Sequence, residues 1–596
     1  MAPRGVARRR ASVKRAVRAL ALILLALFLV AFARTATHGG ANARDGDASA
    51  TVSVVVRSSR RAAPDARADE RRATETPTIA NVDATRDEIV AADDAGVAAG
   101  MDDHRPSSPL KPPAPTWARV RADSRRRRAV REAMREVFGA YLKYARGHDE
   151  LAPMSETGRD DFGGVGATLV DALDTLHIMG LSREFNEALS SLKGTDGEKF
   201  RDLIHGVSDR DVSVFETNIR IIGGLLSTYD LTGDADVLEL AESMASRLSA
   251  AFDTASGVPR SFVNVKTGRA FGLPWTNGNS ILADFGSMHL EWATLSARTG
   301  NALYEEHTNH VFDTISDNAR ASGAPRGLFP HMFHPDKGRF AGGVVSFGAL
   351  GDSFYEYLIK CWRSLGGLRR AERWREMFDD AIAGMKSHML HEWKRGENME
   401  VYAYVSPIGG APKMEHLACF TPGMLVLGAN EAPTVELADE YLEMAKNIAR
   451  TCVEMYTSQP TGLSPDHASF PSGGNVTLVD AKNIQRPETV ESLFYLYRKT
   501  GDDVYRDQAW TIFQAMKRAY RTPSGGWQGV RDVSVDPPKG DDKMQSFFLA
   551  ETLKYLYLTF CEDSVMHLDE WVFNTEAHPF KMTRDVTTLG ARSSSH

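Results

Sequence analysis

The stretch FETNIRIIGGLLSTYDLTGD, residues 215–234, shows the pattern that decides the fold. An acidic residue opens a run in which apolar side chains recur every three or four residues, as on one face of an α-helix. The run stops at Gly-Asp, and glycine is typical just after the last turn of a helix. Comparable segments fill the chain from about Trp117, among them 131–145, 287–301 and 492–503. Alternating strand patterns are few, so the sequence predicts an all-α fold.

The same arrangement recurs at a constant interval. Acidic residues open comparable segments at Glu216, Asp284, Asp352 and Glu488. The first three are 68 residues apart, and the last follows after 136, twice that interval. The missing member falls in 413–428, and similar runs at 166–181 and 543–558 leave room for more. Such a period predicts helical hairpins closed into a ring, with the inner helices starting at one central cavity.

The composition narrows the classes of function. The 596 residues include 71 Lys and Arg against 78 Asp and Glu, a net charge of −7. A chain without an overall positive field is not suited to hold a polyanion, so we expect no nucleic-acid partner. Four cysteines are too few for a disulfide-stapled scaffold.

The N-terminal region predicts a membrane anchor and a stem. Residues 1–18 carry seven basic side chains and no acidic one, and residues 19–33 are continuously apolar. We predict a cytoplasmic tail and a type II signal-anchor, with everything downstream in a secretory lumen. A signal peptide cleaved after Ala33 is the alternative. Residues 34–115 hold too few large apolar side chains to fold and predict a disordered lumenal stem. Residues 116–596 then form the folded helical domain.

Several carboxylates around one cavity suit the hydrolysis of a glycosidic bond. That reaction needs one protonated carboxyl at the leaving oxygen and one carboxylate as base or nucleophile. Glu216, Asp352 and Glu488 stand among apolar residues, and burial raises the pKa of a carboxyl. A single acidic residue is nevertheless more often part of a solvated helix face. The spacing alone therefore leaves the reaction open.

These segments, with TGLSPD (461–466) and FNTEAHP (573–579), resemble glycoside hydrolase family 47, the class I α-1,2-mannosidases that trim N-glycans. The matching stretches follow in order across roughly residues 130 to 580. The resemblance implies an (α/α)7 barrel and an inverting, Ca²⁺-dependent hydrolysis of terminal α-1,2-linked mannoses. The substrates would be high-mannose N-glycans on glycoproteins, trimmed from Man9 towards Man5. The implied residence is the Golgi membrane, with the endoplasmic reticulum as the alternative.

The resemblance also implies roles for the carboxylates. Glu216 is the acid, acting through a water molecule, and Glu488 is the base. Asp352 is the third essential carboxylate, and which of Asp352 and Glu488 is the base stays open. Glu415 is a supporting residue. Further positions in the sugar cleft or around the metal are Arg220, Asp284, Leu350, His416, Arg486, Glu491, Phe547, Glu551 and Glu576.

The calcium prediction depends on Thr575. Taken alone, Asn-Thr-Glu at 574–576 would be a turn or a helix cap. The resemblance instead implies that the hydroxyl and the carbonyl of Thr575 bind the metal directly, with waters and sugar hydroxyls completing the shell. Such an all-oxygen site suits Ca²⁺, which tolerates irregular coordination. Nearby carboxylates would hold those waters.

The cysteines and one asparagine complete the predictions. Cys419 and Cys452 match the disulfide of the family, and a lumenal location permits the bond. Cys361 and Cys561 have no such match, so we expect buried free thiols. Asn475 begins the sequon Asn-Val-Thr and is a predicted surface glycosylation site.

Two departures from the family pattern bear on specificity. Asp284 stands where the family usually has Glu, and Leu350 stands where the endoplasmic-reticulum type has Arg and the Golgi type has Leu. An alternative function is that of a lectin-like factor of the same family, which marks misfolded glycoproteins for degradation. That branch lacks the paired cysteines, so Cys419 and Cys452 favour the enzyme. An unrelated α/α-toroid enzyme would carry neither FNTEAHP nor RPETVES (486–492).

Overall fold

The computed structural model describes residues 117–582, except 195–196, 366–370, 395–401 and 410–411. They belong to the second of two compact units, Arg105–His596. The predicted cytoplasmic tail, signal-anchor and stem lie outside the described residues. Within the described part of the chain, no helix is both long and apolar enough to span a membrane.

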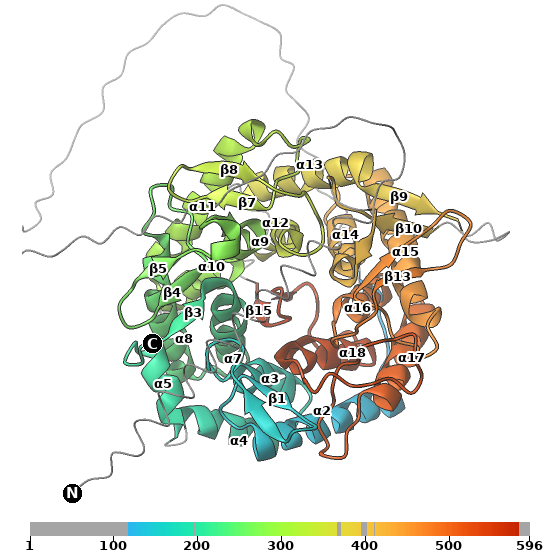
Figure 1. Ribbon diagram of the computed structural model, residues 1–596, viewed down its shortest axis with the longest axis horizontal. Helices are drawn as coiled ribbons and strands as arrows, with labels where there is room; N and C mark the ends of the chain where they lie inside the picture. Colours follow the sequence, from blue (N-terminus) through green and yellow to red (C-terminus); the bar gives the residue numbers. More distant parts are fainter. Residues whose placement is uncertain (1–116, 195–196, 366–370, 395–401, 410–411, 583–596) are drawn as a thin grey trace, which may run out of the picture. The chain divides into compact units, whose positions relative to one another are not determined.

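The described residues form a ring of helical hairpins (Figure 1). The inner helices are α3 (Ala167–Ile178), α7 (Gly223–Thr232), α10 (His289–Thr299), α12 (Asp352–Ser364), α14 (Thr421–Asn430), α16 (Glu488–Thr500) and α18 (Leu553–Thr559). The outer helices are α2 (Ser124–Tyr144), α4 (Ser182–Lys193), α8 (Ala235–Leu248), α11 (Leu303–Asn318), α13 (Glu372–His388), α15 (Val435–Thr457) and α17 (Asp503–Ala519). Each inner helix except α18 packs against the outer helix that follows it.

The first and last hairpins close the ring. Helix α18 packs against α2, the first outer helix, and its preceding turns, η8 (Phe548–Thr552), pack against α3. Among the described residues this gives seven inner and seven outer helices, which confirms the predicted (α/α)7 barrel.

The two layers differ in their apolar pattern because they differ in surroundings. All ten residues of α14 are buried, as expected for a helix enclosed on every side. Outer helix α8 buries only one stripe, which includes Val237, Leu240 and Met244. Glycines end several helices as predicted, and Gly233, Gly300 and Gly501 all adopt positive φ.

Short elements in the connections lead the chain into the inner helices. Before or at the start of inner helices lie α5 (Glu198–Ile204), α6 (Val214–Glu216), η2 (Thr217–Ile222), α9 (Leu282–Gly286) and η7 (His416–Phe420). Other single turns are η3 (Ser249–Phe252), η4 (Pro274–Thr276) and η5 (Arg320–Ser322).

The strands pair in small antiparallel sheets. Two-stranded sheets join β1 (Glu150–Ala152) to β2 (Thr157–Arg159), and β9 (Leu390–Trp393) to β10 (Tyr402–Val405). Three-stranded sheets are β3 (Asp211–Ser213), β4 (Phe262–Asn264), β5 (Ala270–Phe271); β6 (Ser280–Ile281), β7 (Met332–His334), β8 (Arg339–Gly342); and β11 (Met414–Glu415), β12 (His467–Ser469), β13 (Thr477–Asp480). These sheets are confined to connections, so the helical core matches the sequence prediction.

A β-hairpin fills the middle of the ring (Figure 1). Its strands are β14 (Trp571–Phe573) and β15 (Pro579–Lys581). Lys581 donates its backbone N–H to Asp230 (2.9 Å) and accepts from Arg298 (2.9 Å), close to where α7 and α10 end. The strands therefore lie by the ends of the inner helices, and the turn at 574–578 reaches towards their starts.

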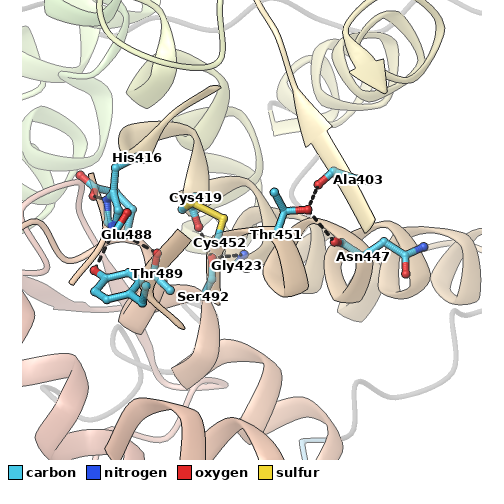
Figure 2. The surroundings of a disulfide bond; sticks show 12 residues. Ala403, His416, Cys419, Gly423, Asn447, Thr451, Cys452, Glu488, Thr489 and Ser492 are labelled. Atoms are coloured by element: carbon cyan, nitrogen blue, oxygen red, sulfur yellow. Dashed lines mark hydrogen bonds and ion pairs between the residues drawn. A yellow bond between two sulfur atoms is a disulfide. The ribbon is translucent and has the colours of Figure 1, made fainter. Parts of the chain in front are cut away.

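The predicted disulfide is present. Cys419 in η7 is bonded to Cys452 in α15, and so an inner connection is tied to an outer helix (Figure 2). Cys361 and Cys561 are free and buried, as predicted.

Candidate active site

A cavity of about 320 Å³ lies where the inner helices begin. The predicted residues on its walls are Glu216, Arg220, Asp284, Leu350, Asp352, Arg486, Glu488, Glu491, Phe547, Glu551, Thr575 and Glu576. Residues from 216 to 576 thus meet in one space. Two predicted residues, Glu415 and His416, lie behind the wall and form hydrogen bonds to residues that line it.

Helix starts deliver the carboxylates to the cavity. Asp352 and Glu488 are the first residues of α12 and α16. Glu216 lies in α6, the first turn of a helical run that continues through η2 into α7, and its backbone N–H is accepted by the Ser213 hydroxyl (3.3 Å). Acidic side chains are favourable there because the first turn of a helix carries partial positive charge.

Sequence reasoning missed Glu356, which also lines the cavity. It follows Asp352 by four residues, and that spacing places two side chains on one helix face. The spacing was therefore a usable signal. Lys360 forms ion pairs with the carboxylates of Glu356 and, at 3.8 Å, Glu491.

Arg220 holds Glu216 in place. Its Nε donates to Oε2 of Glu216 at 2.9 Å, and its Nη1 donates to the Ser546 hydroxyl at 3.0 Å. The guanidinium also pairs with the carboxylate of Glu576 and lies 4.6 Å from the ring centre of Phe162. Burial opposes its charge, but the charges of Glu576 and Glu216 prevail and raise the pKa of Arg220 well above its usual value. Arg220 is thus a fixed positive charge.

His416 fixes the orientation of Glu488 (Figure 2). Its Nδ1 donates to Oε2 of Glu488 at 2.7 Å, and its Nε2 lies 2.9 Å from the Tyr456 hydroxyl and 3.0 Å from that of Thr489. The histidine is 2% exposed. It therefore reaches the cavity through the carboxylate, rather than lining the sugar cleft as the resemblance implied.

Glu415 supports the loop that carries Leu350. Its Oε2 accepts the backbone N–H of Ala349 at 2.7 Å, and its Oε1 lies 3.3 Å from Nε2 of His467. Burial favours its protonation, but the hydrogen bonds from His467 and Ala349 outweigh this and lower the pKa of Glu415. Leu350 has φ of 74°, a costly backbone conformation for a side chain with a Cβ. Packing of the loop thus holds Leu350 at the cavity against local strain.

The carboxyl groups in the cavity repel one another. Burial, reinforced by the negative charges of Glu216 and Asp352, raises the pKa of Asp284 to about 8. Burial and the charges of Glu356, Glu488 and Glu415 raise the pKa of Asp352 to about 7. Burial and the charges of Glu576, Glu488 and Glu491 raise the pKa of Glu551 well above the ordinary range. Burial and the charges of Asp171 and Glu216 do the same for the pKa of Glu576. A bound cation would relieve this repulsion.

The turn that carries Thr575 is held by buried polar contacts. The Asn574 side-chain amide donates to Glu291 (2.8 Å), and its oxygen accepts the backbone N–H of His578 (2.7 Å). Lys554 donates to the Ala577 carbonyl at 2.6 Å. Asp174 pairs with both Lys554 (2.8 Å) and His578 (2.7 Å). These contacts hold Thr575 at the cavity wall.

The residues around Thr575 fit a hard cation. Thr575, Glu551, Glu576 and Glu491 line the same cavity and offer only oxygen ligands, which Ca²⁺ prefers. A second group able to hold a metal consists of Asp466, His467 and Asp480. There, Lys482 already pairs with Asp480 at 2.9 Å, and Arg486 with Asp466 at 2.6 Å. The charge of that second group is therefore already balanced.

Comparison with known proteins places this geometry in a family. The model of glycosyl hydrolase family 47 matches residues 133–582. The chain belongs to glycosyl hydrolase family 47. The predicted family membership is thereby confirmed, and the residues matched run from within α2 to the last described residue.

Named mannosidases are similar to this chain over most of its length. Mannosyl-oligosaccharide 1,2-alpha-mannosidase MNS1 of Arabidopsis thaliana is 43% identical, covering 77% of this chain and 79% of that protein. The endoplasmic reticulum mannosyl-oligosaccharide 1,2-alpha-mannosidase of Homo sapiens is 40% identical, covering 80% and 66%. The solved alpha-1,2-mannosidase from Trichoderma reesei has 29% identity and a TM-score of 0.71, covering 78% of this chain and all of that one.

Proposed function

We propose that this family 47 protein hydrolyses terminal α-1,2-linked mannoses of high-mannose N-glycans, from Man9 towards Man5, with inversion and with Ca²⁺. The observation that carries the proposal is that Glu216, Asp352 and Glu488 line one cavity, which Thr575 also lines. The names of the similar proteins support the linkage and the class of substrate.

Hydrolysis needs a proton at the leaving oxygen and a base for the attacking water. Glu216 delivers the proton, directly or through a water, as the bond between C1 and the glycosidic oxygen breaks. Glu488 accepts a proton from the water whose oxygen bonds to C1 on the opposite face. The contact with His416 keeps the Glu488 carboxylate oriented for this step. Asp352 is the alternative base, since its carboxyl lines the same cavity.

Thr575 would hold the cation, through its hydroxyl and its carbonyl, with Glu551, Glu576 and Glu491 holding water around it. A bound Ca²⁺ supplies positive charge that fixes sugar hydroxyls. The crowded carboxylates support this assignment, because their repulsion falls when a cation is bound.

Leu350 supports the broader, Golgi-type product range. Its apolar side chain offers no hydrogen bond that would select one glycan branch. We place the enzyme in the Golgi membrane through the signal-anchor at 19–33, with the catalytic domain in the lumen and Asn475 glycosylated. Asn475 and Thr477 are both exposed, as a glycan requires. Protease protection and immunolocalisation of the full chain would test the topology and the compartment.

The test of the reaction is a time course on Man9GlcNAc2. The products are separated by chromatography, and NMR follows the anomer released first. We expect progressive loss of mannose to Man5 and initial release of the inverted β-anomer. Glu488→Gln, almost isosteric but unable to accept the proton, should lose at least about 10²-fold in rate while keeping its fold. No release of mannose by the wild-type protein would refute the proposed function.

A further inference from the structure

Helix α12 holds both polar ends of the peptide bond that joins Asn574 to Thr575. The N–H of this peptide belongs to Thr575 and donates to the Tyr357 hydroxyl at 3.4 Å. Its carbonyl belongs to Asn574 and accepts from Nζ of Lys360 at 3.4 Å. Tyr357 and Lys360 are three residues apart on α12, and that spacing places both side chains on one helix face. One helix face therefore fixes the orientation of this peptide.

The Tyr357 hydroxyl is itself held by a buried acceptor on a neighbouring inner helix. It donates to Oε1 of Glu291, in α10, which packs against α12, at 2.7 Å. The same oxygen accepts from Nδ2 of Asn574 at 2.8 Å. Tyr357, Glu291 and Asn574 are each 0% exposed. One carboxylate oxygen thus holds both the hydroxyl that receives the Thr575 N–H and the side chain of the preceding residue.

These contacts leave the two ligand oxygens of Thr575 open. Thr575 lines the catalytic cavity, and within the described residues no hydrogen bond engages its hydroxyl or its carbonyl. Tyr357, Glu291 and Asn574 do not line that cavity. Their effect on anything bound there is therefore exerted through the position of Thr575.

The phenol suits this task because a tyrosine hydroxyl both accepts and donates a hydrogen bond. It accepts from the Thr575 N–H and gives its own proton to Glu291. A ligand that is already oriented loses little freedom when a cation binds. Residues that orient the direct ligands of a metal typically change its affinity about 10–100-fold when they are mutated.

We propose that Tyr357, anchored on Glu291, is a positioning residue for the cation site and orients Thr575 for Ca²⁺ before the ion binds. Asp352 begins the same helix, so α12 joins a carboxylate of the proposed reaction to the support of the cation ligand. The inference rests on the proposed function for the identity of the cation and for the role of Thr575.

The test measures Ca²⁺ binding by calorimetry on the metal-free full chain. Tyr357→Phe removes only the hydroxyl, and we expect the dissociation constant for Ca²⁺ to rise about tenfold. Tyr355→Phe is the matched control. Tyr355 lies on the same helix, is equally buried, and accepts the backbone N–H of Phe329 at 3.0 Å instead. Its dissociation constant should stay within about twofold of that of wild type.

Two further readouts separate positioning from a loss of the fold. Without metal, both variants should still unfold cooperatively in urea, which shows that a weaker affinity does not reflect an unfolded protein. Saturating Ca²⁺ should restore kcat of Tyr357→Phe to within about twofold of wild type, because the carboxylates that react are unchanged.

Equal dissociation constants for wild type and Tyr357→Phe would overturn this role of Tyr357. An equally large loss of affinity in Tyr355→Phe would do the same, because it would reflect a general weakening of α12. So would a kcat that stays low at saturating Ca²⁺. Wild-type protein that binds no Ca²⁺ would refute the proposed cation site and this inference with it. Wild-type protein that binds Ca²⁺ but cleaves no Man9GlcNAc2 would refute only the proposed reaction, and the calorimetric comparison would still decide the role of Tyr357.

Discussion

Replacing Asp284 by Asn should change how stability depends on pH. The pKa of this carboxyl is about 8 in the folded protein, because of burial and the charges of Glu216 and Asp352. In an unfolded chain an aspartate has a pKa of about 3.9. Between these values the folded state binds one more proton at this site than the unfolded state does.

The sign and size follow from linkage. Because the native state binds the extra proton, the free energy of unfolding falls by about 1.4 kcal/mol per pH unit between the two pKa values. Below about pH 4 both states are protonated at this site, and above about pH 8 both are ionised, so the site adds no slope there. Asparagine does not titrate. From pH 5 to pH 7 the variant should therefore gain about 3 kcal/mol relative to wild type.

The assay is urea unfolding at pH 5, 6 and 7, at constant ionic strength and with a chelator. The chelator matters because a bound cation would favour the ionised form of Asp284. Asp507→Asn, at a carboxylate that is 63% exposed, controls for the loss of one negative charge. Stability curves for Asp284→Asn that run parallel to wild type across this range would refute the reasoning.

Three further outcomes are expected. Chelation should abolish activity and lower the melting temperature, and added Ca²⁺ should restore both, because a ligand that binds only the native state stabilises it. Thr575→Ala should weaken this thermal response. Full activity of the metal-free protein would contradict the calcium assignment. Leu350→Arg should make trimming of Man9GlcNAc2 stop earlier, because an Arg at this position would favour one glycan branch. A preference of about 1.4 kcal/mol corresponds to about tenfold discrimination between branches. Wild-type protein that itself stops at one Man8 isomer would show that Leu350 does not determine the product range. Replacing Cys419 and Cys452 together by Ser should lower the free energy of unfolding by about 4 kcal/mol, because the disulfide closes a loop with a sequence separation of 33 residues and so restricts the unfolded chain. An unchanged midpoint of urea unfolding would refute this expectation.

Much of the fold could be predicted because its signals are local. Apolar spacing and helix-ending glycines can be recognised from neighbouring residues alone, and the interval of 68 residues indicated that a helical hairpin is repeated. The number of hairpins came from the resemblance to the family, since the pairing of α2 with α18 joins the two ends of the ring and leaves no local pattern.

The site also combines features that the sequence predicts with features that it does not. Carboxylates at helix starts were visible in the spacing, and their roles came from motifs. The support for Thr575 could not be predicted, because His578 meets Asp174 across 404 residues of sequence. His416 was expected in the cleft, yet its ring is buried behind Glu488, and the sequence alone does not distinguish a residue that touches sugar from one that positions a carboxylate.

The closure of the ring also sets an order of events on the ribosome. Helix α2 is made first, and its apolar face, with Val130, Met134 and Val137 buried in the finished ring, packs on a helix made last. Arg127 likewise pairs with Glu562, 435 residues later. Until α18 has been made, a nascent chain therefore carries part of this apolar stripe uncovered, which makes α2 a natural target for chaperones. The wall that Thr575 contributes arrives last, so catalytic competence begins only when nearly the whole barrel has been synthesised.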